Sequence, residues 1–159
     1  MDMIKEHDVI PFFKLESSEG QVLGPDNFKE KKALVLVFFD ADCVNCSDFL
    51  SDIAGRYDDY KQENAEILAI GKGSIGAVRR IASDKSLPFP VLADTDGHIA
   101  EMFAETLPAV VMTDRFGEVR LTRSAKKEGE HFLDQEFILN RIDLTELECP
   151  ECGVPTWPQ

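Results

Sequence analysis

The segment Leu34–Leu50, LVLVFFDADCVNCSDFL, joins an apolar run to a Cys-x-x-Cys pair and then to an amphipathic segment. Its first residues, up to Phe39, are all apolar and rich in β-branched and aromatic types, which indicates a central strand buried on both faces. From Ser47 to Tyr60, apolar residues recur at every fourth position, which predicts a helix with one apolar face. The cysteine pair therefore lies where a strand passes into a helix.

Cys43 is expected at the start of that helix, where unpaired backbone N–H groups and the helix dipole favour the thiolate. Cys46 follows about one turn later and can form a reversible disulfide with it. Nearby carboxylates, those of Asp40, Asp42 and Asp48, favour the neutral thiol instead. We therefore expect a cysteine pair that is reducing or slow rather than strongly oxidising. The alternative is that both cysteines are inert core residues, since free cysteine is often buried.

Composition limits the classes of function. With 159 residues, of which 43% are hydrophobic, the chain fits a single domain with a real core. A net charge of −13 without a basic block lacks the electrostatic footprint of a nucleic-acid-binding protein. Neither a signal-peptide pattern nor a long apolar run is visible, so we expect a cytoplasmic protein with no membrane partner. In a reducing compartment, Cys-x-x-Cys pairs are redox-active or bind metal.

The remaining pattern predicts an α/β fold in which helices alternate with largely parallel strands, followed by an antiparallel hairpin. Ser74 is a good N-cap, and Gly117 suits the left-handed position of the hairpin loop. The expected elements are an extended segment Val9–Leu15 that Pro11 confines to a sheet edge or to an irregular start, its hairpin return Gln21–Leu23, a short helical turn near Phe28, a strand Glu66–Ile70, a helix from Ser74, a strand Leu87–Leu92, a helix His98–Ala104, strands Ala109–Met112 and Glu118–Thr122, and a closing helix Phe132–Leu147.

Several short motifs of this sequence occur in the same order as in a known group of proteins. They are Pro11–Leu15, similar to P-x-F-x-L; Phe38–Cys46, similar to F-W-A-x-W-C-x-x-C; Phe89–Asp94 with Gly97, similar to F-P-x-L-x-D-x-x-G; and Leu107–Ala109 followed by Thr113–Gly117. Over about residues 9–122 the chain thereby resembles the redoxin branch of the thioredoxin superfamily, which contains peroxiredoxins and thiol-disulfide reductases. The resemblance implies a thioredoxin-like fold, a central mixed β-sheet flanked by helices, with a redoxin-type N-terminal hairpin and insertion.

The resemblance also implies roles for individual residues. Cys43 would be the nucleophile and Cys46 the resolving cysteine of a thiol-disulfide oxidoreductase, with a protein or small-molecule disulfide as substrate and an external thiol as reductant. Leu107 and Pro108 would bind the substrate, with Pro108 in the cis form and facing Cys43.

The main alternative is a peroxiredoxin-like thiol peroxidase with antioxidant activity. Its family motif, P-x-x-x-[T/S]-x-x-C, fits neither Cys43 nor Cys46. The family's peroxide-activating arginine would fall at or beside Pro108, and the arginine nearest to Pro108 in sequence is Arg115, in the hairpin loop. A peroxidase needs such a positive charge to stabilise the thiolate and the departing oxygen, so disulfide exchange is favoured.

The second cysteine pair lies in a tail, residues 148–159, that follows the redoxin domain of residues 1–147. Cys149 and Cys152 in C-P-x-C-G resemble one zinc knuckle, but tetrahedral zinc needs four ligands and this pair supplies two. A second subunit could complete a shared zinc site in a homodimer, or the tail could be an internal dithiol for Cys43. A third reading is therefore a non-catalytic binding or zinc-bridged dimerisation module. The histidines, His7, His98 and His131, share no metal-site spacing and are expected at the surface.

Overall fold

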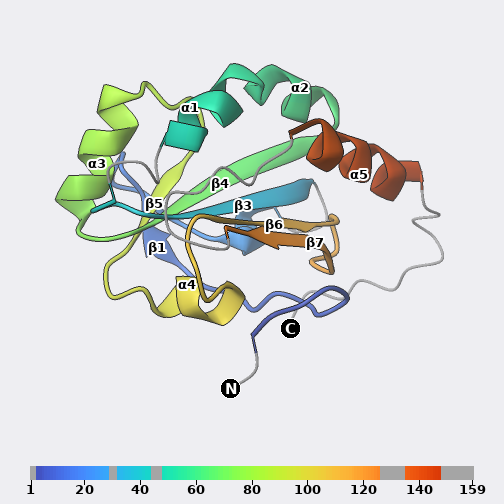
Figure 1. Cartoon of the computed structure of the whole chain (residues 1–159), viewed down its shortest axis with the longest axis horizontal. Coiled ribbons are helices and arrows are strands. Elements are labelled where there is room, and N and C mark those ends of the chain that lie inside the picture. The colour runs from blue at the N-terminus through green and yellow to red at the C-terminus, as the bar shows by residue number, and fades with distance from the viewer. Residues whose placement is uncertain (1–2, 29–31, 44–47, 126–134, 148–159) are drawn as a thin grey trace.

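The computed structural model describes residues 3–28, 32–43, 48–125 and 135–147, and within these residues one five-stranded mixed sheet forms the centre of the molecule (Figure 1). β3 lies in the middle, parallel to β4 and antiparallel to β6, while β4 and β5 are parallel and β6 and β7 antiparallel. The strand order is β5 (Val91–Asp94), β4 (Ala65–Lys72), β3 (Ala33–Asp40), β6 (Ala109–Thr113) and β7 (Val119–Ser124). The predicted mixed α/β sheet is confirmed.

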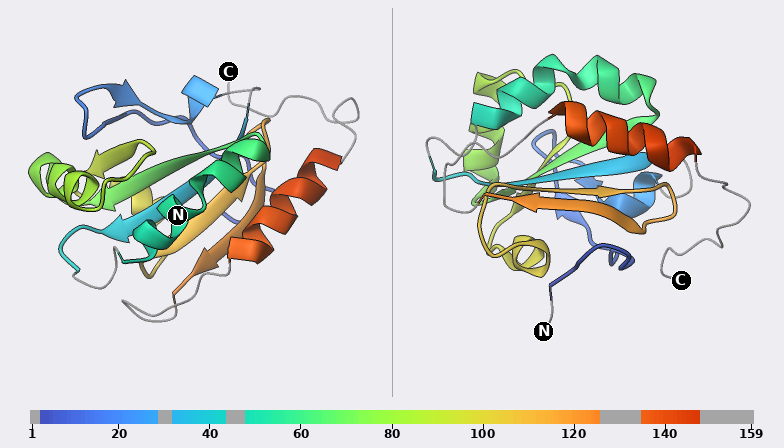
Figure 2. Two further views of the ribbon diagram at one scale, coloured as in Figure 1. Left: turned by 90° about the horizontal axis from the view of Figure 1, so that it is seen from above. Right: turned by 45° about the vertical axis from the view of Figure 1, so that its right-hand side comes forward.

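Both faces of β3 are buried, as its apolar run predicts. Side chains of a strand alternate between the faces, so Val35 and Val37 belong to one core cluster and Leu34 and Leu36 to the other. The first face is covered by the helices α1 (Asp48–Gly55), α2 (Tyr57–Gln62), α3 (Ile75–Asp84) and α5 (Gln135–Leu147). The second face is covered by α4 (His98–Phe103) and the N-terminal segment (Figure 2).

One predicted helix is divided in the structure. The apolar pattern of residues 47–60 predicts a continuous helix, whereas α1 ends at Gly55 and α2 begins at Tyr57. Arg56 between them has φ −111° and ψ 11°, and its N–H bonds to the Ile53 carbonyl at 3.0 Å. Glycine lowers helix stability, which favours a break beside Gly55, and Ile53 before the break and Tyr60 after it are both buried.

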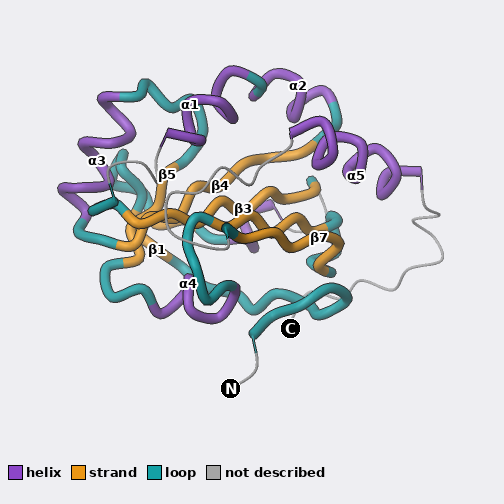
Figure 3. The backbone as a smooth tube through the Cα atoms, in the orientation of Figure 1, coloured by secondary structure: helices purple, strands orange, loops and turns teal. Residues whose placement is uncertain are grey.

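The N-terminal segment crosses the α4 face from one sheet edge to the other (Figure 3). Val9 pairs with Glu118 beside β7, and Ser17 pairs with Leu92 on β5. β1 (Leu15–Glu16) just before Ser17 and β2 (Val22–Leu23) just after it form the predicted hairpin, and the 3₁₀ turn η1 (Pro25–Phe28) leads to β3. A chain that covers parts of both edges limits the unpaired backbone available for edge-to-edge aggregation.

The local signals in the second half of the chain are largely confirmed. Ser74 caps α3 by accepting the Ala77 N–H at 3.1 Å, and Gly117 has φ +84° in the β6–β7 loop. The closing helix is described from Gln135, so residues 132–134 and the tail 148–159 lie outside the described residues. Among the helices that the structure describes, we find none whose length and apolar character would suit a membrane span.

Candidate active site

Cys43 stands just beyond the carboxyl end of β3, in a tight turn. The Asp40 carboxylate accepts the Asp42 N–H at 2.9 Å, and the Asp40 carbonyl accepts the Cys43 N–H at 3.1 Å. Ala41 is tied to the neighbouring strand, because its N–H donates to the Lys72 carbonyl at 3.0 Å. These bonds fix the backbone that carries the sulfur, although β3 itself has ended.

The cysteine is partly exposed and takes part in a disulfide bond. Its partner lies outside the described residues, as do Cys46 and the two tail cysteines. The first described residue of α1 is Asp48, so the predicted position of Cys43 at a helix start is not tested. Because Cys43 is only partly buried, the interpretation of this cysteine as an inert core residue is not supported.

The Leu107–Pro108 peptide bond is cis, as the resemblance implied. The antiparallel register of β3 and β6 pairs Phe38 with Ala109, so Pro108 lies level with Phe39, near the carboxyl end of β3. The Pro108 carbonyl accepts the Ala125 N–H at 2.9 Å, which fastens this loop to the end of β7. The substrate-binding role of Leu107 and Pro108 remains a prediction.

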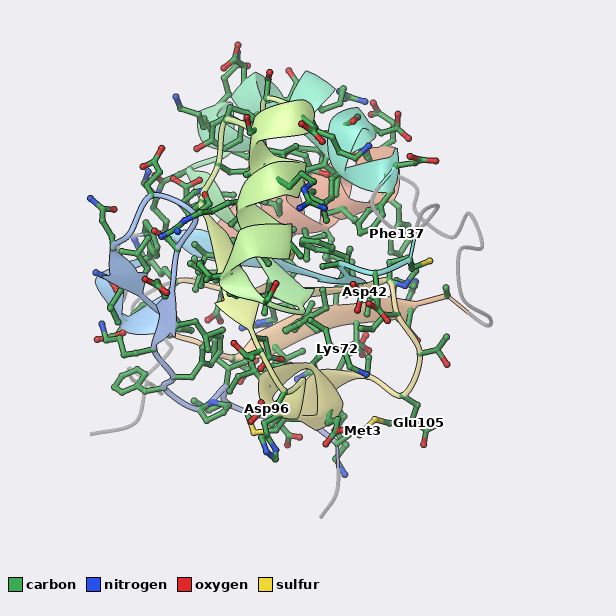
Figure 4. All side chains as sticks on the ribbon, turned by 90° about the vertical axis from the view of Figure 1, so that its left-hand side faces the viewer. Met3, Asp42, Lys72, Asp96, Glu105 and Phe137 are labelled. Carbon is green, nitrogen blue, oxygen red and sulfur yellow. The ribbon has the colours of Figure 1, made fainter. Side chains whose placement is uncertain are left out.

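A pocket opens beside this loop, at the carboxyl ends of β3 and β4. Asp40 and Lys72 are paired in the strand register and line one wall, and Leu107 lines another. The aliphatic stem of Lys72 lies against Gly97, where a Cβ atom would come within 3.1 Å of the Lys72 Cδ and Cε. Gly97 also has φ +78°, so both the turn and the close approach favour glycine. Figure 4 looks onto this end of the sheet, with Lys72 between Asp42 and Glu105.

The comparison with protein families decides the classification. Residues 7–122 match the model of the AhpC/TSA family. The chain belongs to the AhpC/TSA family. The matched residues include β3, Cys43, the pocket, the cis-proline loop and the β6–β7 hairpin, and they agree with the range of the resemblance seen in the sequence.

Members of the AhpC/TSA family and its neighbours differ in their chemistry. Peroxiredoxin Bcp of Escherichia coli is 24% identical over 103 residues, which cover 65% of this chain and 66% of that protein. Thiol-disulfide oxidoreductase ResA of Bacillus subtilis is 28% identical over 120 residues, which cover 74% and 66%. The chain therefore spans about two thirds of the length of these curated relatives. Peroxidoxin BcpB of Mycobacterium tuberculosis has the same fold, with a TM-score of 0.76 at 16% identity, covering 89% of this chain and 97% of that one.

A peroxidase needs a positive charge, such as that of an arginine, near the reacting thiol. Arg115, the arginine nearest to Pro108 in sequence, lies in the hairpin loop at the far end of β6. The antiparallel register instead brings Arg123 opposite Val110, close to the cis-proline end. Its guanidinium donates to the Thr122 carbonyl at 2.9 Å and lies 5.0 Å from the centre of the Phe137 ring. Arg123 is thus engaged on β7 and α5, and no thiol contact is observed for it among the described residues.

Sequence reasoning missed Lys72 and Arg123 as neighbours of the Cys43 site. Gly97 belonged to a motif of the resemblance, but its contact with Lys72 becomes visible only in the structure. For the metal prediction, no group of three or more His, Cys, Asp or Glu side chains suited to a metal ion occurs in the described part of the chain. His7 and His98 are exposed as expected, and His131 lies outside that part.

Proposed function

We propose that this protein is a thiol-disulfide oxidoreductase in which Cys43 is the nucleophile and Cys46 the resolving cysteine. The observation that carries the proposal is the partly exposed, disulfide-bonded Cys43 directly after β3, at the same sheet end as the cis-Pro108 loop. A reductase of this kind needs an accessible sulfur at a fixed backbone position and a second thiol to release the captured substrate. The ResA relative supports the same reading.

In the proposed reaction, the Cys43 thiolate attacks one sulfur of a substrate disulfide and forms a mixed disulfide, while the other substrate sulfur leaves as a thiolate and takes a proton from solvent. The Cys46 thiolate then attacks the Cys43 sulfur. This step forms the Cys43–Cys46 disulfide and releases the second substrate thiol. The substrate gains two electrons and two protons, and an external dithiol restores the cysteine pair by the reverse exchange.

The test uses the full chain and single serine variants. We expect wild-type protein to accelerate reduction of 2-hydroxyethyl disulfide by dithiothreitol, and C43S to lose this acceleration by about 10³-fold, as for loss of a nucleophile. C46S should instead accumulate a mixed disulfide on Cys43, visible by mass spectrometry. C149S/C152S is the matched control and should retain the rate. A C43S variant with undiminished activity would overturn the proposal.

A peroxidase function is the second candidate, because several relatives are named peroxiredoxins. Two observations weigh against it: the sequence around Cys43 lacks the peroxidase motif, and Arg123 is bound to Thr122 and Phe137. Peroxide consumption driven by dithiothreitol or thioredoxin, in the absence of disulfide reduction, would select this candidate. Absence of both activities with retained zinc would select the binding or dimerisation module.

The position of α5 bears on the role of the tail. The Arg141 guanidinium donates to the Arg120 carbonyl at 3.4 Å, so α5 lies at the hairpin end of β7 there and continues away from Cys43 (Figure 1). α5 ends at Leu147, about one and a half turns beyond Arg141.

The described end of α5 lies at the hairpin end of the sheet, which supports an intermolecular role for the tail rather than an internal dithiol. We propose that Cys149 and Cys152 form half of a zinc site completed by a second copy of the chain. Zinc analysis together with mass in solution tests this idea: half a zinc ion per chain in a dimer is expected, with loss of the dimer in C149S/C152S. A metal-free monomer would contradict it. We further propose action in the cytoplasm without nucleic-acid or membrane partners, which the acidic composition supports and which cell fractionation can check.

A further inference from the structure

The pocket beside the cis-proline loop has a volume of about 270 Å³, large enough for one long side chain. It lies between the carboxyl ends of β3 and β4, the helix α4 and the loop that ends at Leu107. The pocket is adjacent to the turn that carries Cys43, because Asp40 lines the pocket and also accepts the Cys43 N–H.

The pocket is acidic. Its charged lining consists of Asp40, Glu101, Glu105 and a single cation, Lys72, and exposed Asp42 stands next to Cys43. Among the described residues, Asp42, Glu101 and Glu105 take part in no ion pair. Carboxylates elsewhere on the surface do so, for example with Lys85 and Arg120. Unpaired carboxylates around a concave site raise the local concentration of cations.

Lys72 does not neutralise this group. Its stem is held against Gly97, and its ammonium forms no ion pair within the described residues although three carboxylates line the same pocket. One ammonium among these carboxylates leaves the pocket with a net negative charge. Lys72 therefore provides an internal control, since its removal should change selectivity in the direction opposite to removal of a glutamate.

We infer that this pocket selects disulfide substrates that carry a positive charge beside the reacting sulfur, such as a polypeptide with Lys or Arg next to its cysteine. Glu101 and Glu105 are its specificity-determining residues. The inference rests on the proposed disulfide-reductase function and specifies its substrate class. Electrostatic selection of this kind acts mainly on encounter and weak binding, so it should appear in kcat/KM and weaken with salt.

The experiment compares small disulfides of similar size: cystamine, a dication; 2-hydroxyethyl disulfide, which is neutral; and 3,3′-dithiodipropionate, a dianion. Each catalysed rate is divided by the uncatalysed rate with dithiothreitol, which removes differences in intrinsic reactivity. At low salt we expect the normalised kcat/KM to fall in that order, and the ratio of cystamine to dithiodipropionate to collapse in 0.5 M NaCl. A peptide disulfide with Lys beside cysteine should likewise exceed its Glu counterpart.

Variants connect the preference to the pocket. E101Q/E105Q should lower the cystamine-to-dithiodipropionate ratio by at least about tenfold at low salt, since each charge at about 7 Å in water changes a rate by about 2.7-fold per unit charge on the substrate and salt screens part of this effect. K72Q should raise the same ratio several-fold. The matched control E6Q/D58N changes the net charge equally at exposed positions outside the pocket and should leave the ratio within twofold of wild type.

The outcomes separate the two proposals. A wild-type ratio near one, or a ratio equally lowered by E6Q/D58N and E101Q/E105Q, would overturn the pocket inference, while reduction of the neutral disulfide would leave the reductase function standing. A preference for small cations without a preference for the Lys peptide would also contradict the polypeptide assignment. Failure to reduce any of the probes would remove both the function and the inference.

Discussion

At the β6–β7 hairpin, Asp114 is 7% exposed, and its carboxylate accepts the backbone N–H groups of Phe116 and Glu118 and two N–H groups of Arg120, at 2.8–3.2 Å. At the opposite end of the same sheet, Asp42 is exposed and its carboxylate takes part in no ion pair within the described residues. Buried carboxylates persist when hydrogen bonds and opposite charge compensate desolvation. At these two positions the hairpin carboxylate is buried and stabilises its turn, whereas the carboxylate beside Cys43 is exposed to solvent.

The start of β4, which also lies away from Cys43, follows the pattern of the hairpin. Glu66 is 9% exposed and accepts the Tyr57 hydroxyl at 2.7 Å and the Ile67 N–H at 2.9 Å. The Lys32 ammonium lies 3.9 Å from its other oxygen. Two buried carboxylates thus connect turns and helices to the distal end of the sheet, whereas the turn that carries Cys43 is held by backbone hydrogen bonds and by the partly exposed Asp40 carboxylate.

The largest effect that this comparison predicts is on stability at the hairpin. D114A should lower the free energy of unfolding by about 3 kcal/mol, because it leaves Arg120 and two backbone N–H groups without their acceptor. The matched change at the catalytic end, D42A, should alter it by less than about 0.5 kcal/mol. Urea unfolding monitored by circular dichroism measures both. Equal losses in the two variants would show that the two ends do not differ in this way.

A smaller effect concerns alkaline pH. Burial raises the pKa of Tyr57, and the hydrogen bond to Glu66 raises it further, so the folded protein holds this proton more tightly than the unfolded chain does. Stability from this source is fully present at pH values below about 10, the pKa of a tyrosine in the unfolded chain. It is lost as the pH rises above that value. The loss is less than about 1.4 kcal/mol per pH unit, because solvent screens a partly exposed group.

Urea unfolding of wild type and Y57F between pH 8 and pH 11 checks this prediction. Y57F removes the titrating group and keeps the ring that packs against Phe89, so its stability should fall less steeply above pH 10. Y60F serves as a comparison, because burial likewise raises the pKa of Tyr60 without a hydrogen bond to a carboxylate. Identical pH profiles for wild type and Y57F would mean that Tyr57 and its contact with Glu66 contribute nothing to the pH dependence of the free energy of unfolding.

The sequence predicted the fold well at positions where neighbouring residues by themselves indicate a buried strand, a helix cap or a turn. The apolar run of β3, the Ser74 cap and Gly117 were all of this kind. The break at Arg56 was missed because both helices continue the same apolar spacing. Lys72 and Arg123 were missed for another reason: they reach the Cys43 end only through strand register, which links positions about 30 and 80 residues away from Cys43 in sequence. A turn residue such as Asp114 likewise shows its buried network only when the return strand delivers Arg120.

The smallest predicted effect tests the catalytic end directly. If the exposed Asp42 carboxylate acts on the neighbouring sulfur, D42N should increase the fraction of Cys43 present as thiolate, because a negative charge at about 6 Å in water disfavours a second one. Alkylation of the reduced protein by iodoacetamide at pH 7 should then become about two- to threefold faster. The measurement uses a background of C46S, C149S and C152S so that Cys43 is the reacting thiol, and E6Q is the control for net charge. A rate unchanged by D42N but raised by E6Q would assign the effect to the overall charge of the chain, and the Asp42 carboxylate would then have no specific influence on the nucleophile.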